Sequence, residues 1–190
     1  MDYLLMFHNL KGRNIMVVGG GEIALRKVRL VQEASAIITI VAKDFCPDLL
    51  EMDARDKEHG CNGLILITAS YEHQHMLDLP NIVMVIAATN DRDLNRLVSE
   101  HAQSANILSN VVDDPKFSTV IFPSIVDRSP IQIAISSGGD APVLVRLLRT
   151  RFEALLPAGM SKLGSLACSF RERVKAKFSS GADRKAFWEE

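Results

Sequence analysis

The chain has few cysteines, and their spacing rules out two common uses of this residue. Cys46, Cys61 and Cys168 are odd in number, lie far apart, and never occur in a C-x-x-C spacing. A disulfide-held scaffold and a paired-cysteine metal or redox motif are therefore excluded. We expect three free thiols, which are typical of the reducing cytoplasm.

Long apolar runs are also missing. No stretch approaches the ~18 consecutive apolar residues that a membrane-spanning helix needs. Residues 1–7 lack the basic start of a secretory signal. With 47% hydrophobic and 24% charged residues, the composition predicts a globular cytoplasmic protein with no membrane partner.

Aromatic residues are scarce, at 6%, and are not interleaved with the basic residues. This pattern argues against a nucleic-acid partner. The net charge of −1 nevertheless hides a contrast, because residues 1–127 carry −6 and residues 128–190 carry +5. Two explanations of this contrast stay open. The two regions could be complementary faces that help a dimer assemble, or the basic region could bind an anionic ligand.

The chain does contain a glycine-rich turn, within the segment Asn14–Ala24. An apolar run ends in three glycines and continues into a helical pattern, so that Gly19-x-Gly21-x-x-Ala24 fits the dinucleotide-binding fingerprint. Gly19 permits a tight turn, Gly21 lets the backbone approach a pyrophosphate, and Ala24 keeps the helix close to the strand.

The residues around this turn are the candidate cofactor contacts. The unpaired backbone amides of the first helical turn, at Glu22 and Ile23, would face the phosphates together with Gly20. A plain structural turn stays open as the alternative, because a glycine triplet after an apolar run is a weak signal by itself.

The choice of cofactor depends on the next strand, Ile37–Val41. An acidic residue that binds the adenosine ribose is expected near Ala42, and the nearest candidate is Asp44, which follows Lys43. We predict NAD as the cofactor, with Asp44 as its ribose contact. Because Asp44 lies two residues after the expected position, NADP stays open as the alternative.

Further apolar runs predict the rest of a parallel sheet, with strands at Leu64–Thr68, Ile82–Ala88 and Ile107–Val112. Thr89 follows the most apolar of them and is a candidate cofactor contact, because ligands of open α/β sheets bind at the carboxyl ends of strands. The next helix has an apolar side made of Leu94, Leu97, Val98 and His101. This alternation of strands and helices predicts a Rossmann-like, doubly wound α/β fold.

Two connections in this part carry polar residues. Residues 51–63 indicate an exposed helix or loop, and Tyr71–Pro80 indicates a second connection. His73 and His75 lie in the latter at a spacing that two metal ligands on a strand can have. Because no third ligand is near, we interpret them as solvated loop histidines and predict no metal site.

The pattern changes after Pro115. Extended runs at Phe117–Ile125 and Ile131–Ser137 are separated by Asp127–Pro130, and the second run alternates apolar with polar or small residues. A period of two is typical of strands with one covered face. Two strands alone are marginal, so we predict that this segment takes its cover from a second copy and forms a homodimer.

Two helices are expected to complete the chain. The first begins near Pro142 and stops at Pro157, and the second runs over Met160–Phe178. The predicted organisation is a Rossmann domain in residues 1–115, a small α+β dimerisation segment in 116–156, and a helical region in 157–190 that contributes to the substrate site.

Four segments in this order resemble a known family. They are Val17–Lys27, Asn110–Pro115, Phe122–Arg128 and Ser136–Gly139. Together they are similar to the precorrin-2 dehydrogenase and sirohydrochlorin ferrochelatase family, which forms the amino-terminal half of siroheme synthase. The resemblance covers nearly the whole chain, whereas the fused methyltransferase domain of the full synthase is absent. We expect either a stand-alone enzyme or a piece of a longer fusion.

The resemblance implies a reaction. Precorrin-2 loses a hydride to NAD and a proton to a base, which gives sirohydrochlorin, and ferrous iron is then inserted to give siroheme. Asp113 matches the family's catalytic aspartate, as base in the oxidation and acceptor of pyrrole protons during iron insertion. A structural alternative for the aspartate pair is a cap on a helix that begins at Pro115, for which Asp114 is better placed.

The resemblance also implies a tetrapyrrole site in the basic third. Ser137, next to Gly138, matches a serine beside that site, with a polar turn residue as an equal alternative. The acetates and propionates of the tetrapyrrole form a polyanion that Arg128, Arg146 or Arg149 would pair with. A dehydrogenase without chelatase activity and a non-catalytic nucleotide-sensing module stay open as rival functions, as does a cobalamin route in place of siroheme.

Overall fold

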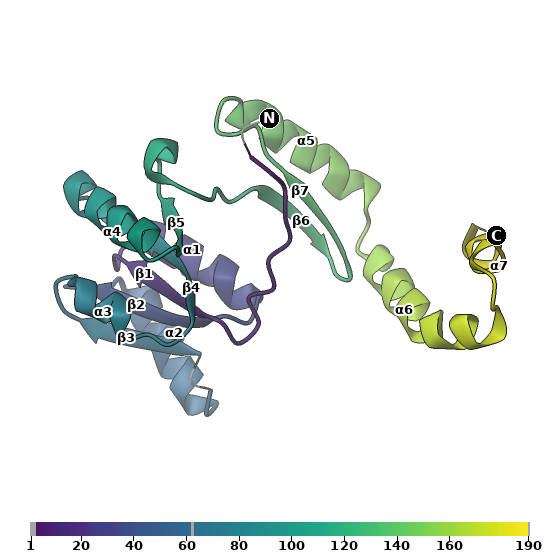
Figure 1. Ribbon diagram of the computed structural model, residues 1–190, viewed down its shortest axis with the longest axis horizontal. Coiled ribbons are helices and arrows are strands. Elements are labelled where there is room, and N and C mark those ends of the chain that lie inside the picture. Colours follow the sequence, from purple (N-terminus) through teal and green to yellow (C-terminus); the bar gives the residue numbers. More distant parts are fainter. Residues whose placement is uncertain (1–2, 62, 190) are drawn as a thin grey trace. The chain divides into compact units, whose positions relative to one another are not determined.

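The structure is a computed structural model that describes residues 3–61 and 63–189 (Figure 1). The chain divides into two compact units, of which the first ends at Ile121 and the second begins at Phe122. The first unit therefore continues beyond residue 115, where we predicted a domain boundary. It does so because the amides of Thr119 and Val120 both donate to the carbonyl of Ser109, in the last strand of its sheet.

The first unit contains a five-stranded parallel sheet in the order β3-β2-β1-β4-β5. Its strands are β1 (Asn14–Val18), β2 (Ile37–Ala42), β3 (Leu64–Thr68), β4 (Ile82–Ala87) and β5 (Leu108–Val111). All five predicted strands are confirmed. Val18 lies in register with Val41 on one side and Ala87 on the other, so the carboxyl ends meet at one edge. The chain order reverses between β1 and β4, which is where open α/β sheets bind ligands.

Helices cover both faces of this sheet (Figure 1). They are α1 (Glu22–Glu33), α2 (Pro47–Glu58), α3 (His73–Leu77) and α4 (Arg92–Ser104). Helix α1 buries the side predicted from its periodicity, with Leu25, Val28 and Val31 at most 1% exposed. Helix α2 occupies much of the segment for which helix and loop were both open, and α3 forms where only a connection was predicted.

Helix α4 presents a different side to the sheet from the one that we predicted. Its buried residues are Asn95, Val98, Ser99 and Ala102, whereas Leu97 is 43% exposed. The prediction for Leu97 was wrong because the buried side includes two polar residues, which an apolar pattern does not register. The burial of Ser99 is compensated by hydrogen bonds to Ser109 Oγ and to the Phe117 carbonyl.

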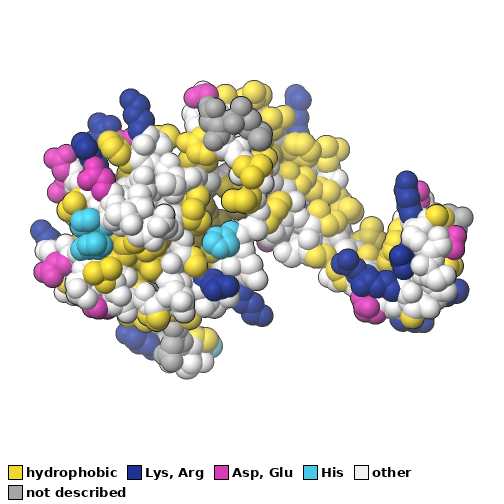
Figure 2. All heavy atoms as spheres, in the orientation of Figure 1, with side chains coloured by type: hydrophobic (Ala, Val, Ile, Leu, Met, Phe, Trp, Pro, Cys, Tyr) yellow, Lys and Arg dark blue, Asp and Glu magenta, His cyan; other side chains and the backbone are white. Residues whose placement is uncertain are grey.

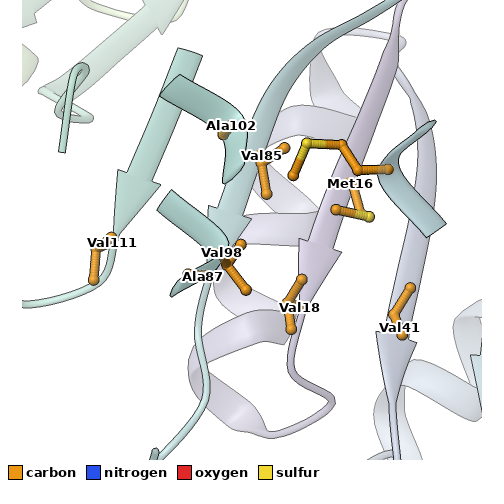
Figure 3. Close-up of a cluster of buried hydrophobic side chains, with 9 residues drawn as sticks. Met16, Val18, Val41, Val85, Ala87, Val98, Ala102 and Val111 are labelled. Atoms are coloured by element: carbon orange, nitrogen blue, oxygen red, sulfur yellow. The ribbon is translucent and has the colours of Figure 1, made fainter. Parts of the chain in front are cut away.

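The core between the sheet and helices α3 and α4 is apolar throughout (Figure 3). It is made of residues that are each at most 4% exposed: Met16, Val18, Val41, Met76, Val85, Ala87, Val98, Ala102 and Val111. Since both faces of the sheet are covered, strands β1 to β4 are nearly continuous apolar runs, whereas β5 buries the polar Ser109 and Asn110. Full burial of one such valine or methionine contributes about 1.5–3 kcal/mol, so an aspartate at Val98 would break this core.

The open edge of β5 is closed by the segment that follows it. The Val111 amide donates to Ser118 Oγ at 2.9 Å, and the Ser109 amide donates to Thr119 Oγ1 at 2.8 Å. These hydroxyls take the place of a neighbouring strand. A single 3-10 turn, η1 (Pro115–Phe117), precedes them. The strand predicted at Phe117–Ile125 is therefore wrong over most of its length.

The second unit begins with an antiparallel hairpin of β6 (Ser124–Arg128) and β7 (Ile131–Ile135). Asp127 and Arg128, which we predicted as part of the separator, belong to β6. Three helices follow: α5 (Pro142–Leu155), α6 (Gly159–Lys177) and α7 (Gly181–Glu189), the last of which was not predicted. No helix in the described part of the chain has the length and hydropathy of a membrane span.

The helices of the second unit carry large apolar side chains on their surface (Figure 2). On α5, Val143, Leu144 and Leu147 are 59%, 56% and 58% exposed. Among the described apolar residues of this unit, the buried ones are Val126 and Val174, which are 1% and 4% exposed. Exposed apolar surface of this extent is typical of an interaction site. That the hairpin and the helix after it pair with a second copy stays a prediction.

Candidate functional site

A cleft of about 590 Å³ lies at the carboxyl ends of strands β1 to β4 in the first unit. Its lining includes all seven predicted cofactor contacts: Gly19, Gly20, Gly21, Glu22, Ile23, Asp44 and Thr89. These residues, which are far apart in the sequence, therefore share one concave surface at the switch point of the sheet. Their role as cofactor contacts stays a prediction.

Each glycine of the turn meets a different constraint. Gly19 has a φ of 121°, and a Cβ there would overlap the carbonyl oxygen of Ala88, which confirms the tight turn. A Cβ at Gly20 would overlap the carbonyl oxygen of Asp44, so Gly20 lets the loop after β2 pack against the turn. Gly21 adjoins open space and is the N-cap of α1, which leaves room for a ligand at the free amides.

The residues after β2 determine what the cleft offers to a ribose. Ala42, where the fingerprint expects an acid, is 9% exposed. Lys43 and Asp44 are exposed and both line the cleft. A cation suits a ribose 2′-phosphate and a carboxylate suits a 2′-hydroxyl, so the two neighbours offer opposite cofactor preferences.

The turn after β4 is fixed by a buried asparagine. Asn95, 6% exposed on α4, accepts from the Thr89 amide at 3.1 Å and hydroxyl at 2.7 Å, and donates to the Thr89 carbonyl at 2.9 Å. Asp91 caps α4 by accepting from the Leu94 amide at 3.0 Å. Together these bonds hold Thr89 at the wall of the cleft. Sequence reasoning missed Asn95, although its position three residues before the buried Val98 was a usable signal.

Asp113 follows β5 at the same edge of the sheet but is not part of the cleft lining. Its backbone is left-handed, with a φ of 59°, a conformation that aspartate adopts more readily than most residues. Its exposed carboxylate interacts with the half-buried Lys27 of α1. Burial lowers the pKa of Lys27, and the charge of Asp113 partly offsets this effect. Sequence reasoning did not single out Lys27, since no spacing rule connects α1 with the end of β5.

Asp114 does not cap a helix, so this alternative for the aspartate pair was wrong. Its carboxylate accepts two hydrogen bonds from Arg92, from Nε at 3.1 Å and from Nη2 at 2.8 Å. The element that begins at Pro115 is one 3-10 turn without a side-chain cap, which offers few free amides. Asp114 is only 8% exposed, and its ion pair with Arg92 anchors the loop after β5 to the start of α4.

The predicted tetrapyrrole residues all lie in the second unit. Ser137 accepts from the Ala141 amide at 2.9 Å, and the Gly138 amide donates to Ser136 Oγ at 3.1 Å, in the loop before α5. The bond made by Ser137 is the one expected of a polar turn residue. Both residues are half-buried.

The three predicted arginines have different surroundings. Arg128 is half-buried and donates from Nε to the Leu156 carbonyl at 2.8 Å, so it joins the hairpin to the end of α5. Arg149 forms an ion pair with Glu153 at 3.1 Å, one turn further along α5. Arg146 is exposed on the same helix. A ligand can therefore reach Arg146 and Arg149 more readily than Arg128.

His73 and His75 are not solvated loop residues, and this prediction was wrong. Both lie on α3, where His73 stacks on His101 with ring centroids 4.1 Å apart, and His75 Nδ1 accepts from the Glu72 amide at 3.0 Å. In residues 3–61 and 63–189, no group of three or more His, Cys, Asp or Glu side chains is arranged to hold a metal ion.

Comparison with known proteins identifies the family. A family model described as putative NAD(P)-binding matches residues 6–124, and one for the central part of sirohaem biosynthesis proteins matches residues 128–155. A third, for the sirohaem synthase dimerisation region, matches residues 159–190. The chain belongs to the siroheme synthase family. The resemblance carried by the four sequence segments is thereby confirmed.

Siroheme synthases of several bacteria are similar over the whole chain. Those of Stutzerimonas stutzeri and Methylobacillus flagellatus are each 48% identical over 190 residues, and that of Azotobacter vinelandii is 47% identical. Each comparison covers 100% of this chain and 39% of the relative. The chain therefore spans about two fifths of the length of these relatives.

A solved structure of SirC, precorrin-2 dehydrogenase, has the same fold. The TM-score is 0.73 at 23% sequence identity, and the match covers 97% of this chain and 86% of that chain. At this identity the likeness shows the fold alone. It confirms the predicted fold class, a Rossmann-like parallel sheet followed by a small antiparallel region and carboxyl-terminal helices.

Proposed function

We propose that this chain oxidises precorrin-2 to sirohydrochlorin with NAD as the hydride acceptor. The substrate gives a hydride to the nicotinamide and a proton to a base, and is thereby oxidised by two electrons. The observation that supports this most directly is Asp113, a carboxylate beside Lys27 at the sheet edge that also carries the glycine turn. The relatives, which are siroheme synthases, suggest the substrate class.

The residues of the cleft fit a nicotinamide dinucleotide. The amides of Glu22 and Ile23, beside the open space at Gly21, would hold the pyrophosphate. Asp44 would bind the hydroxyls of the adenosine ribose. When bound, NAD supplies the acceptor for the hydride. Calorimetry should give tighter binding of NAD than of NADP, and the opposite order would point to Lys43 as the selecting residue.

Asp113 acts as the base in this proposal. Its carboxylate is exposed, so a substrate can reach it, and it interacts with the half-buried Lys27 of α1. The turn that carries it is held on both sides: the Val112 amide donates to the Ala87 carbonyl at 3.0 Å, and Asp114 is anchored by its ion pair. A base on a fixed turn stays in the geometry that proton transfer needs.

The same carboxylate would serve the second reaction, insertion of ferrous iron into sirohydrochlorin. Two pyrrole N–H protons must leave as the iron, which is a substrate here, enters the macrocycle. Asp113 would accept these protons in turn and release them to water. The product is siroheme, with no change in the oxidation state of the iron.

The carboxylates of the tetrapyrrole need cationic partners. Arg146 and Arg149 on α5 are the stronger candidates, with Ser137 and Gly138 in the preceding loop as neutral contacts. Arg128 is a weaker candidate because the Leu156 carbonyl already engages it. We further propose that the protein acts as a homodimer in the cytoplasm, a state that the match to the dimerisation region supports.

One experiment separates this function from its rivals. The purified protein is incubated with precorrin-2 and NAD, and then with ferrous iron, while the absorbance spectrum follows the tetrapyrrole and NADH. The proposed enzyme makes sirohydrochlorin and then siroheme. A dehydrogenase without chelatase activity stops at sirohydrochlorin, and a nucleotide-sensing module binds NAD without either conversion.

A further inference from the structure

The proposed reaction does not use a cluster of aromatic and imidazole rings in the first unit. His101 of α4 stacks on His73 of α3, with ring centroids 4.1 Å apart and planes at 16°. The hydroxyl of Tyr71, in the loop after β3, lies 3.1 Å from His101 Nδ1. Tyr71 also lines the cleft, so the cluster connects the packing of α3 and α4 with the cleft wall.

Tyr71 lies toward the adenosine end of the cleft. The strand order β3-β2-β1 leads from the glycine turn after β1, past the ribose position after β2, to the loop after β3. That loop contributes Ala69, Ser70 and Tyr71 to the lining. Among the described residues that line the cleft, Tyr71 is the only aromatic one, and an aromatic face suits a planar base.

We propose that Tyr71 positions the adenine of the cofactor, and that His101, stacked on His73, holds Tyr71 in place only while the His101 imidazole is neutral. This inference rests on the nicotinamide cofactor of the proposed function, but not on Asp113 or the tetrapyrrole. It makes the affinity for the cofactor depend on pH through His101, and not through a residue that takes part in the reaction.

The surroundings of His101 favour its neutral form. Burial and the neighbouring His73 lower its pKa, and the group that opposes them is Glu100 on the same helix. His73 Nε2 is buried and makes no hydrogen bond within the described part of the chain, so the stack offers no acceptor for an added proton.

The remaining titratable groups around the stack do not supply a counter-charge. Burial raises the pKa of Tyr71 to about 12, so the phenol keeps its proton and can donate it to His101 Nδ1. Glu72 and His75, at the start of α3, form a reciprocal capping box with each other's backbone. Protonation of His101 at Nδ1 would reverse this hydrogen bond, so that the Tyr71 hydroxyl would have to accept instead of donate. It would also place a charge against the ring of His73 that Glu100 offsets only in part.

The sign of the pH dependence follows from this arrangement. Binding of the cofactor favours neutral His101, so affinity is at its full value above the ordinary histidine pKa of about 6.5. It decreases as the pH falls through the lowered pKa of His101. Between these limits the decrease is at most about tenfold for each pH unit, since a single proton is involved.

Calorimetric titration of the whole chain with NAD, from about pH 8 to about pH 5, tests the inference. The parent should bind NAD more weakly as the pH falls. His101→Gln keeps an amide partner for the Tyr71 hydroxyl but takes no proton, so its profile should be flat. His73→Gln removes the neighbour that lowers the pKa of His101, so the midpoint of the decrease should move to higher pH. Tyr71→Leu should weaken NAD binding at every pH by about two- to tenfold.

Matched controls distinguish these effects from general ones. His59→Gln changes an exposed histidine at the end of α2, which is engaged with the Arg55 carbonyl, and should keep the parental pH profile. Urea denaturation at both pH limits shows which variants are folded. If Tyr71→Leu does not fold, Tyr71→Phe keeps the ring without its anchor and should bind NAD more weakly than the parent near pH 8.

The possible outcomes separate the two proposals. Parental pH dependence in His101→Gln, or parental affinity in the folded Tyr71 variant, would overturn this inference. If the parent binds no NAD at any pH, both this inference and the cofactor assignment are wrong. If NAD binds with the predicted pH profile but precorrin-2 is not oxidised, only the proposed function is wrong.

Discussion

At the scale of single residues, adjacent glycines of the turn have different requirements. Gly21→Asp should leave the protein folded, because the side chain enters open space and aspartate is a favourable N-cap. It should abolish NAD binding, because the carboxylate would occupy and repel the pyrophosphate site. Calorimetry measures this directly, and unchanged affinity for NAD would contradict the role that we give to Gly21.

The neighbouring glycine gives a contrasting prediction, because a side chain there would meet backbone and not open space. Gly20→Ala places a methyl group against the Asp44 carbonyl, which is backbone and cannot move aside cheaply. We expect it to lower the free energy of unfolding by about 1–3 kcal/mol, as overpacking does. Equal stability of Gly20→Ala and the parent in urea would show that this loop relaxes more than the structure indicates.

The second prediction at this scale concerns the ion pair of Asp114 with Arg92. Asp114→Ala should cost about 1 kcal/mol of stability, because Arg92 is largely exposed and water replaces part of the lost interaction. Arg92→Ala should cost a similar amount, and the double variant should cost less than the sum of the two. Strict additivity in urea denaturation would mean that the pair contributes nothing.

Single residues were predictable where their signal is local. The turn at Gly19 follows from the fingerprint. Asp113 was singled out because it lies in a segment that resembles a family, and its role stays a prediction. Sequence reasoning missed the roles of Asn95, Lys27 and Arg92, the partner of Asp114. Each role depends on a contact between elements that are far apart in the sequence. Such contacts have no period or spacing that a single sequence reveals.

At the scale of elements, strands β1 to β4 were predictable because burial on both faces makes each a nearly continuous apolar run. The segment after β5 was not, because side-chain hydroxyls hold it in place of a backbone ladder. Ser118 accepts from the Val111 amide at 2.9 Å and donates to the Asp114 carbonyl at 3.1 Å. An extended pattern in the sequence is therefore not enough to make a strand at this edge.

This closure of the sheet edge makes a stability prediction. Ser118→Ala leaves the buried Val111 amide without its acceptor and should lower the free energy of unfolding by about 1–3 kcal/mol in urea. The matched control is Ser104→Ala, at the exposed end of α4, which should change stability by less than about 0.5 kcal/mol. Equal effects of the two substitutions would contradict a special role for Ser118.

At the scale of the whole molecule, the apolar surface of α5 predicts a dimer. Sedimentation at micromolar concentration should give a dimer for the parent, and Leu147→Glu should shift it toward the monomer, since the charge would be buried against the partner. Leu50→Glu, at a half-exposed leucine of α2 in the first unit, should not. A parental monomer would contradict the prediction, as would a dimer that tolerates Leu147→Glu.

One chain reveals only part of this assembly. The one-faced hairpin and the exposed helix indicate that a partner is needed. Which surface the partner covers depends on how a second copy packs, and a single sequence does not reveal that packing. We predicted dimerisation through residues 116–156, and the model for the family's dimerisation region matches residues 159–190. Leu166→Glu on α6 tests this second region in the same sedimentation experiment.

The central claim concerns the whole reaction: Asp113 takes the proton that precorrin-2 loses as NAD accepts the hydride. The most direct measurement is the rate of precorrin-2 oxidation by Asp113→Ala at saturating NAD. We predict a decrease of roughly 10²-fold or more, the usual contribution of a positioned base, with NAD affinity and dimerisation unchanged. Iron insertion should decrease with it, while Asp114→Ala should lose far less activity. Oxidation of precorrin-2 by Asp113→Ala at the parental rate would contradict the assignment of Asp113 as the base.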